Sequence, residues 1–515
     1  MRAAASRRVL LLLLTLCAVG SERRLWAQEA RLTLAEVVRT TLARNASVAL
    51  GQWDVQAQAG ALHEAAGAFD PQVSATVAGE RARTPSPGDV GEGPGDILSR
   101  GLDYTAGIEW RLRPGVVVSP NLSFSRQGIS TEGVPTRNTG EARLDFLIPL
   151  QRGWGGGALL AAEHAATAAL DASREELRHV RALRVRDAVT AYWEYVAARR
   201  SLEVLQESEE RARTLVQQTE ILIQADARPA SDRFSVQANL ASKRAARLAG
   251  EGVVASARQA LVLVAGLGVE RFASLPPPAD SLPAAPVAAS DAVLGDSAVL
   301  AQAIFRRADL AAARSRVVAA RSALHGARNE VAPRLDMRVG VGYTGLEDGQ
   351  DLERLFSPFY TRTRGFNAQV EVVYGFPLAR NVEMGRVMRS TAADRRAAIY
   401  LEELARAVTL DVALAAETLR RSREELEVSR EAVRLHGESV DSEIQKFRLG
   451  TSTLLEVIQV EDGRTAAMLG WVATRRRYAV AVAQLHFQAG TLLDGDAETV
   501  DVDRLVAWVP AVARL

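Results

Sequence analysis

The sequence predicts a mainly helical protein with a smaller set of antiparallel strands, built from two structural repeats. Alanine, leucine, valine, glutamate and arginine dominate its 515 residues, a mixture that favours long helices. The segment ALHEAAGAFDPQVSATV, which starts at Ala61, returns as ALHGARNEVAPRLDMRV, which starts at Ala323, at a constant offset of 262. The order of elements returns as well: a helix, a proline, strands, a second proline, a long helix, a tight turn and a helix.

The first residues have the pattern of a signal peptide. Three arginines precede an apolar run from Val9 to Val19, which is too short to span a bilayer, and we predict that residues 1–27 are removed on export. The only cysteine, Cys17, lies in this leader; its lipidation is a minor alternative, because Leu16 before it is not small. The mature chain would then have no disulfide and no thiolate metal ligand. The 63 Lys and Arg nearly balance the 62 Asp and Glu, so no binding to nucleic acid is expected.

Period-two alternation bounded by Gly and Pro predicts strands in both copies. The segments with this pattern are Gly107–Trp110 and Ala142–Ile148 in the first copy, and Leu335–Tyr343 and Val370–Tyr374 in the second. A further hairpin is a candidate over Asp103–Arg113 and Val116–Arg126, around Pro114-Gly115. The polar, Gly/Pro-rich stretches Arg83–Arg100 and Thr344–Arg364 are predicted to be solvent-facing loops.

Aromatic residues gather in the two strand regions. Twelve of the 27 lie within residues 104–154 and 343–376, a concentration that the aromatic girdles of an outer-membrane barrel require. A soluble sheet also favours aromatics, so this observation alone leaves both alternatives open; the leader and the repeat favour the barrel. Beyond the leader no segment resembles a transmembrane helix, and an exported chain of this kind enters a membrane only as a closed β-barrel.

The predicted helices are unusually long. No Gly or Pro interrupts residues 158–228, roughly 100 Å of helix at about 1.5 Å per residue, and a similar pattern runs from Val387 to Phe447. In the second helix one apolar row repeats every seven residues, which predicts a coiled-coil partner: Val412, Leu419, Leu426, Val433, Val440 and Phe447. A thinner row on another side, interrupted by Arg421, consists of Leu414, Val428 and Leu435. Two seams suit a ring in which every helix has two neighbours; a solid bundle is the alternative.

Each long helix is predicted to reverse at a tight turn. In KFRLGTS, Gly450 supplies the backbone freedom needed after a helix C-terminus, and Thr451 or Ser452 is expected to cap the returning helix. The equivalent turn in the first copy is ADARPASD, in which Pro229 suits a first helical turn and Ser231 or Asp232 suits a cap.

Four fragments of the sequence, taken together with their order and with the internal duplication, resemble the TolC-like outer membrane efflux family. They are LTLAEVVRTTLARN (Leu32–Asn45), FLIPLQRGWG (Phe146–Gly155), ADLAAARSRVVAARSAL (Ala308–Leu324) and FRLGTSTLLEVIQVED (Phe447–Asp462). The resemblance covers essentially the whole mature chain. The resemblance implies a homotrimer whose chains jointly close a 12-stranded β-barrel in the outer membrane, continuous with a long periplasmic α-helical coiled-coil barrel. The candidate hairpin would add strands to the four per chain that the family implies.

The resemblance also implies partners and site residues. Substrates would leave through the shared lumen, and the helical tips would dock a periplasmic adaptor that links them to an inner-membrane pump of the RND or ABC type. The implied tip residues are Phe447, Arg448, Leu449, Gly450 and Thr451 in the second copy, and Asp226, Ala227 and Arg228 in the first, with Asp226 where the family has glycine. Glu456 and Gln459 match the periplasmic constriction, where three Glu456 carboxylates would raise one another's pKa.

The predicted organisation is a signal peptide (1–27), a first repeat (28–268), a Pro/Ala-rich linker (269–292), a second repeat (293–490) and a C-terminal periplasmic tail (491–515). We expect no enzymatic activity, cofactor or metal, because the six histidines lack ligand spacing and no nucleophile elbow or phosphate loop is present. The alternative function is a periplasmic coiled-coil scaffold or adaptor without a channel. Within the family, export of a protein instead of small molecules is also open.

Overall fold

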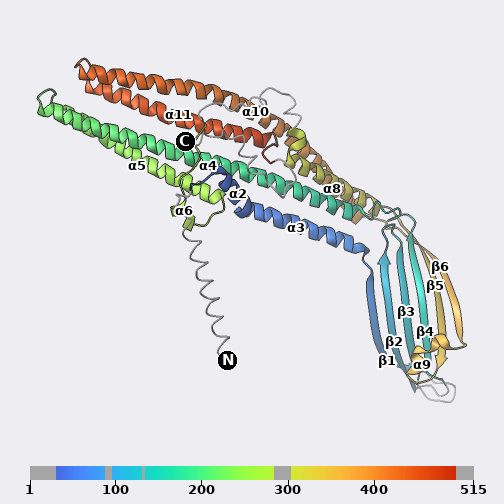
Figure 1. The fold of residues 1–515 in the computed structure, drawn as a ribbon. Coiled ribbons are helices and arrows are strands. Elements are labelled where there is room, and N and C mark those ends of the chain that lie inside the picture. The colour runs from blue at the N-terminus through green and yellow to red at the C-terminus, as the bar shows by residue number, and fades with distance from the viewer. Residues whose placement is uncertain (1–30, 87–94, 130–133, 284–302, 494–515) are drawn as a thin grey trace, which may run out of the picture. The chain divides into compact units, whose positions relative to one another are not determined.

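The computed structural model describes residues 31–86, 95–129, 134–283 and 303–493 (Figure 1). The predicted signal peptide with Cys17, the predicted linker beyond residue 283 and the predicted tail beyond residue 493 lie outside the described residues. The chain divides into two compact units, and each repeat contributes to both. One comprises residues 1–53, 175–311 and 403–515, and the other comprises residues 54–174 and 312–402.

The described part of the first unit consists mainly of helices. They are α2 (Leu34–Arg44), α4 (Ala161–Gln224), α5 (Asp232–Val264), the short α6 (Glu270–Ser274), α10 (Asn381–Arg448) and α11 (Leu454–Gln488), of which α4 and α10 continue into the second unit. The α4 and α10 helices have 64 and 68 residues, as the absence of breakers predicts. Within the part of the chain that the structure describes, no helix combines the length and apolar character needed to cross a membrane.

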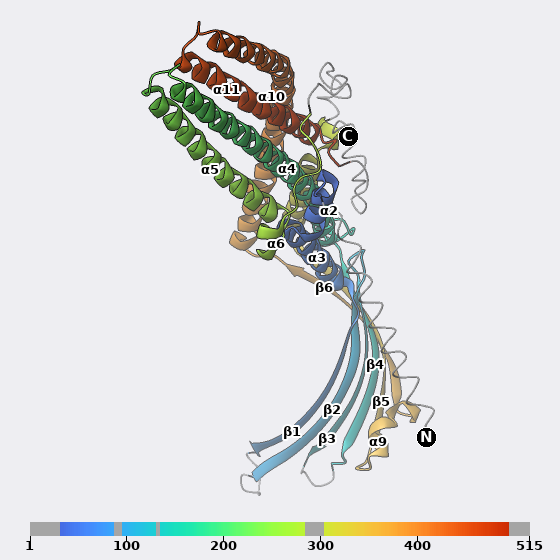
Figure 2. The same cartoon turned by 60° about the vertical axis from the view of Figure 1, so that its left-hand side comes forward.

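Two hairpins, α4–α5 and α10–α11, lie side by side with their turns at the same end (Figures 1 and 2). The contacts place the helices in the order α5, α4, α11, α10. Glu209 of α4 accepts a 2.6 Å hydrogen bond from Arg247 of α5, and the hydroxyls of Ser208 on α4 and Thr465 on α11 lie 3.1 Å apart. One hydrophobic cluster joins α2, α4, α5 and α11, and a second joins α10 to α11.

The seven-residue row on α10 is the face that packs on α11. Val412, Leu419, Leu426 and Val440 are buried, and Leu419 and Leu426 contact a cluster around Tyr478. The second row has the opposite environment: Leu414, Val428 and Leu435 are 66%, 71% and 50% exposed. The α10 helix therefore has one apolar seam satisfied within the chain and one that is not.

The N-terminal helix is not continuous, contrary to the single helix that the sequence suggests before the first strand. The chain breaks at Asn45, between α2 and α3 (Ala46–Ala66). The side-chain amide of Asn45 donates a 2.7 Å hydrogen bond to the Val264 carbonyl, and its oxygen accepts one from the Ser47 amide. The second bond satisfies the Ser47 amide in the first turn of α3, and the first satisfies a carbonyl at the end of α5. Asn45 thus joins the break between α2 and α3 to the end of α5.

A buried hydroxyl ties α4 to the start of α2. The Tyr192 hydroxyl lies 2.6 Å from a carboxylate oxygen of Asp280 and also donates to the Leu32 carbonyl. The same Asp280 oxygen accepts a hydrogen bond from the Leu34 amide in the first turn of α2. Burial, followed by the hydrogen bond to Asp280, raises the pKa of the Tyr192 hydroxyl far above its ordinary value.

The second unit contains a six-stranded antiparallel sheet in simple sequential order (Figure 1). Its strands are β1 (Gln72–Ser86), β2 (Gly95–Arg111), β3 (Val117–Ile129), β4 (Arg137–Pro149), β5 (Arg334–Asp348) and β6 (Arg364–Gly375). Pairing of β4 with β5 joins the two repeats. Within the described residues β1 pairs only with β2, and β6 only with β5, so both outer strands have a free edge.

The strands are longer than the sequence predicts, and β1 is a strand that the prediction did not include. The prediction of a loop over Arg83–Arg100 is wrong at both ends of that stretch, because β1 continues to Ser86 and β2 begins at Gly95. Arg83 pairs with Leu98 in the ladder, and its side chain lies 3.6 Å from Asp96. Polar residues are compatible with a strand whose faces are open to solvent, so polarity does not mark the end of these strands.

The predicted loop Thr344–Arg364 is also shorter and contains helical turns. After β5 the chain forms α9 (Glu353–Phe356) and η3 (Pro358–Tyr360). The ring of Phe356 lies 5.8 Å from Tyr104 of β2 and 5.1 Å from Phe124 of β3, centroid to centroid, and Phe359 lies 5.6 Å from Phe124. This aromatic cluster fixes the segment against the first repeat's strands.

The sequence offset of 262 returns in the structure. The α3 and α8 (Ala308–Glu330) helices begin 262 residues apart, and so do β1 and β5. A 3-10 turn, η1 (Gly67–Phe69), follows α3 before β1. The repeats therefore align in register from these helices into the first strand that follows each of them.

Candidate functional site: the helical tips and the two faces of the sheet

The two hairpin turns have the same backbone. After α4 ends at Gln224, Asp226 adopts a left-handed conformation with φ of 53°, and after α10 ends at Arg448, Gly450 does so with φ of 78°. The Ala227 amide donates 2.9 Å to the Leu222 carbonyl, and the Thr451 amide donates 3.0 Å to the Lys446 carbonyl. These are the long hydrogen bonds of a Schellman motif at both tips. Aspartate is one of the few side chains other than glycine that tolerate this conformation, so Asp226 preserves the turn.

The returning helix α11 is capped by Thr453, not by Thr451 or Ser452 as predicted. The Thr453 hydroxyl accepts a hydrogen bond from the Glu456 amide, and the Glu456 carboxylate accepts one of 2.7 Å from the Thr453 amide. This reciprocal pair is a capping box. The Ser452 hydroxyl donates to the Glu456 carboxylate instead, and also to Glu443 at the end of α10.

The first-copy turn begins its returning helix differently. The α5 helix starts at Asp232, so Pro229 lies before it and not in its first turn. Ser231 occupies the N-cap position but its side chain makes no capping hydrogen bond. Arg233 anchors this end of the helix instead, because its guanidinium donates a 2.9 Å hydrogen bond to Glu220 of α4.

The structure brings the two predicted tips into contact. The guanidinium of Arg228 lies 4.4 Å from the centre of the Phe447 ring, within cation–π distance, and also donates to the Ser452 carbonyl at 3.5 Å. Below these contacts the hairpins enclose a groove of about 980 Å³, whose walls include Phe447, Leu449 and Gly450 from one tip and Ala227 and Arg228 from the other. Leu449, at the apex, is 78% exposed.

The predicted constriction residues, Glu456 and Gln459, lie one turn apart in α11 and are both exposed. Within a single chain the hydrogen bonds from Thr453, first the backbone amide and then the hydroxyl, lower the pKa of the Glu456 carboxyl. The raised pKa expected for a ring of three carboxylates would have to overcome this capping. The Glu456 side chain therefore has a structural function in its own helix, which the T-x-x-E spacing of the sequence already contained.

Two charged residues one turn further along α11 were not predicted from the sequence. Glu461 accepts a 2.9 Å hydrogen bond from Arg211 of α4, and Asp462 forms an ion pair with Lys243 of α5. Both carboxylates hold the second hairpin to the first. The signal was absent because their partners lie more than 200 residues away in the chain.

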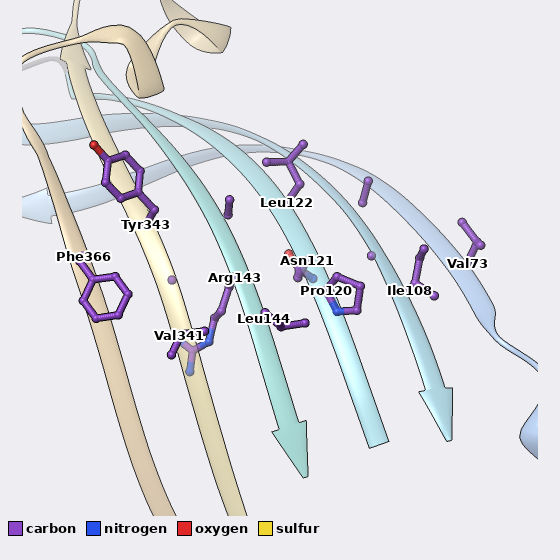
Figure 3. A pocket seen from close by; sticks show the side chains of 14 residues that line it. Val73, Ile108, Pro120, Asn121, Leu122, Arg143, Leu144, Val341, Tyr343 and Phe366 are labelled. Carbon is purple, nitrogen blue, oxygen red and sulfur yellow. The ribbon is translucent and has the colours of Figure 1, made fainter. Parts of the chain in front are cut away.

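The sheet has one apolar and one polar face. Cross-strand register aligns one apolar row through all six strands: Val73, Ile108, Pro120, Leu144, Val341 and Ala368. Much of this face lines a shallow open depression of about 620 Å³, in which Leu122, Tyr343 and Phe366 also take part (Figure 3). Many of its side chains are exposed, including Val73, Phe366 and Val370.

The opposite face consists of polar side chains. Thr76 and Thr105 pair across β1 and β2, and Ser123 pairs with Glu141 across β3 and β4. Charges of both signs follow further along the same face. Arg143 donates a 2.8 Å hydrogen bond to Asp145, Arg338 lies 3.5 Å from Glu371, and Arg143 also donates to Gln369. Such a face suits contact with water.

No protein-family model matches the sequence, and no curated protein matches it. Solved structures match its fold along most of the chain. The outer membrane channel CmeC of Campylobacter jejuni superposes with a TM-score of 0.65 at 14% identity, covering 92% of this chain and 88% of that one. The outer membrane protein VceC of Vibrio cholerae gives 0.65 at 15% identity, covering 89% of this chain and 96% of its own. A membrane protein of Pseudomonas aeruginosa gives 0.66 at 17% identity, covering 89% and 92%.

This chain has the fold of the TolC-like outer membrane channels. The resemblance that the sequence fragments indicated is thus confirmed at the level of the fold. The candidate functional site of this fold consists of the two hairpin tips and of the sheet with its apolar and polar faces. Among residues 31–86, 95–129, 134–283 and 303–493, no cluster of three or more His, Cys, Asp or Glu side chains could hold a metal ion.

Proposed function

We propose that this chain is the outer-membrane channel of a tripartite efflux or type I secretion system, a passive duct and not an enzyme. Its signal peptide would direct it to the periplasm. There three copies would join into one barrel in the outer membrane, continuous with a helical barrel in the periplasm. The proposal rests on the observation that the sheet ends in two free edges and the row of helices ends on both sides in exposed apolar residues.

The sheet supports this proposal through its edges and its faces. The free edges of β1 and β6 leave rows of unpaired backbone groups, which a neighbouring copy would satisfy by pairing β6 with β1. An apolar face on one side and a polar face on the other match the lipid and the lumen sides of a membrane barrel. A periplasmic scaffold or adaptor, the alternative function, would not need an apolar sheet face of this extent.

The helices support it in the same way. The row α5, α4, α11, α10 ends on both sides in exposed apolar residues. On α10 these include Leu414 and Val428, and on α5 they include Phe234 and Leu248. Long helices are stable only when packed along their length. A neighbouring copy would cover both edges and close the ring.

The test is to purify the mature chain from membranes and measure its mass and its conductance. We expect a detergent-extracted trimer that is found in the outer membrane fraction, migrates on gels in a heat-dependent manner and forms pores in planar lipid bilayers. A water-soluble monomer that forms no pore would refute the channel and favour the scaffold.

We further propose that the tips dock a periplasmic adaptor, through which the channel meets an inner-membrane pump. The exposed apex residue Leu449 and its equivalent in the first turn, Ala225, both follow the last helical residue. Substituting Leu449→Asp should abolish adaptor cross-linking and export while leaving the trimer intact; Ala225→Asp tests the first tip in the same way. Equal loss from both variants would show that both tips engage, and no loss from either would refute docking here.

Glu456 and Gln459 would face the lumen near the tips and favour cations. Gln459→Glu would add a second carboxylate one turn away and increase cation over anion permeability in bilayers. The capping box stays intact in that variant, which makes it a cleaner test than removal of Glu456. Unchanged ion selectivity would exclude position 459 from the constriction.

A further inference from the structure

The two repeats contribute unequal numbers of strands. Among the residues that the structure describes, the first supplies four, β1 to β4, and the second supplies two, β5 and β6. Because β1 and β5 begin 262 residues apart, and β4 and β6 each end at a proline-containing turn before a long helix, β1 matches β5 and β4 matches β6. The β2–β3 hairpin is therefore the addition, and it has no counterpart among the described residues of the second copy.

This additional hairpin is built into the sheet. The β2 strand pairs with β1 from Glu109 to Gly95, and β3 pairs with β4 from Val117 to Gln127. Its faces continue those of the neighbouring strands, with Ile108 and Leu122 on the apolar side and Thr105 and Ser123 on the polar side. The hairpin thus adds two strands to the sheet instead of covering one of its faces.

The hairpin is also held at the loop end of the sheet. Tyr104 of β2 and Phe124 of β3 form the aromatic cluster with Phe356 and Phe359, which belong to the second repeat. Arg126 of β3 donates a hydrogen bond of 2.8 Å to Asn138 of β4 and a second one to the Asp351 carbonyl. Residues from both repeats therefore fix β2 and β3 in the plane of the sheet.

We propose that the assembled channel has an eighteen-stranded barrel, six strands from each of three chains, with an outer-membrane pore as wide as that of a general porin. This inference rests on the proposed trimeric channel. Strands about 4.8 Å apart and tilted by about 40° give a backbone diameter of roughly 36 Å for eighteen strands and roughly 24 Å for twelve. Side chains occupy about 5 Å on each side, so the open width is roughly 25 Å.

A pore of this width changes the class of cargo that the membrane section admits. An α-helix with side chains is about 10–12 Å across. Two helices side by side, or a compact peptide, would therefore fit through the open width of this pore. The polar wall has charges of both signs, as in the pairs Arg143–Asp145 and Arg338–Glu371, and so it would select little by charge. The membrane section would pass bulky hydrophilic cargo, including polypeptide, and selection by size would fall to the periplasmic tips.

The first experiment determines the barrel of the reconstituted trimer by electron cryo-microscopy, for the full chain and for a variant without residues 87–133. This deletion removes β2 and β3 and joins β1 to β4, which run antiparallel. We expect eighteen strands for the full chain and twelve for the variant, with the backbone diameter reduced by about one third. A full-chain trimer with twelve wall strands would overturn the inference and leave the proposed channel intact, whereas absence of a trimer would overturn the channel itself.

A second variant covers the case in which the deletion does not fold. The mature chain has no cysteine of its own under the predicted cleavage, so disulfides are introduced between facing positions, Thr76→Cys with Thr105→Cys and Ser123→Cys with Glu141→Cys. Both pairs should oxidise within the trimer and leave entry of polyethylene glycol from the outer side unchanged. Failure of either pair to form in assembled trimers would show that the hairpin is outside the wall.

Discussion

The exposed apolar row on α10 gives the sharpest test of the proposed ring of copies. Replacing Leu414, Val428 and Leu435 together by alanine removes most of the apolar side-chain surface of this row. Alanine has the highest helix propensity, so α10 should remain helical. None of the three residues belongs to the clusters that pack α10 on α11, so the fold of the single chain should be unaffected.

The magnitude follows from how much of each side chain is still exposed. Complete burial of a Val or Leu side chain contributes about 1.5–3 kcal/mol, and these three are 66%, 71% and 50% exposed in the single chain. Each would therefore contribute roughly 1–2 kcal/mol when a neighbour covers it, of which alanine retains a small part. The variant should lose about 3–5 kcal/mol at each interface, and about 9–15 kcal/mol over the three interfaces of the proposed trimer.

The assay is urea dissociation of the detergent-solubilised trimer, followed by sedimentation, with helix content followed separately by circular dichroism. The triple variant should dissociate at clearly lower urea while its helix content persists. Glu427→Ala, an exposed substitution on the same helix, is the matched control and should behave as the unaltered chain. If the triple variant and the control dissociate at the same urea concentration, this row does not contact a neighbouring copy and the ring has been inferred from the wrong face.

Three further predictions concern the single chain. Tyr192→Phe should lower the free energy of unfolding by about 1–2 kcal/mol, measured by denaturant titration, because the half-buried Asp280 loses its hydroxyl donor. No change in this free energy would mean that water replaces the hydroxyl. Asp226→Gly should stabilise the first turn by about 0.5–1 kcal/mol, and Gly450→Ala should destabilise the second turn by about 1 kcal/mol. Amide exchange at each tip measures both changes. If both substitutions stabilise their turns, or both destabilise them, the left-handed conformation is contradicted. The pKa of Glu456 is lowered from its ordinary value near 4.5, so its cap should be fully effective above pH 4.5 and lost as the pH falls through the lowered pKa. Amide exchange at the start of α11 should follow this pH dependence, and Glu456→Gln should abolish it.

Much of the helical architecture was predictable because it depends on local, repetitive patterns. The seven-residue row that includes Leu419 predicted the face that packs on α11, and Gly450 predicted its turn. The cap at Thr453 was also available in the sequence as T-x-x-E, and was missed because hydroxyls closer to the glycine were preferred.

The remaining features depend on contacts that no local pattern contains. The bond that joins the break at Asn45 to α5 requires the Val264 carbonyl, and the meeting of the tips requires Arg228 to reach Phe447 from the other repeat. Strand ends were misplaced for a different reason. In a sheet with one polar face, charged residues such as Arg83 continue the ladder, and polarity alone then resembles a loop.

The hairpin β2–β3 returns the chain to the side of the sheet from which it left. Its insertion or removal therefore leaves the connections to α3 and α4 unchanged. In the proposed trimer it would change the barrel by six strands at a time. The circumference of the proposed barrel could therefore be changed by adding or removing one hairpin, without altering the sequence of the helices that form the tips.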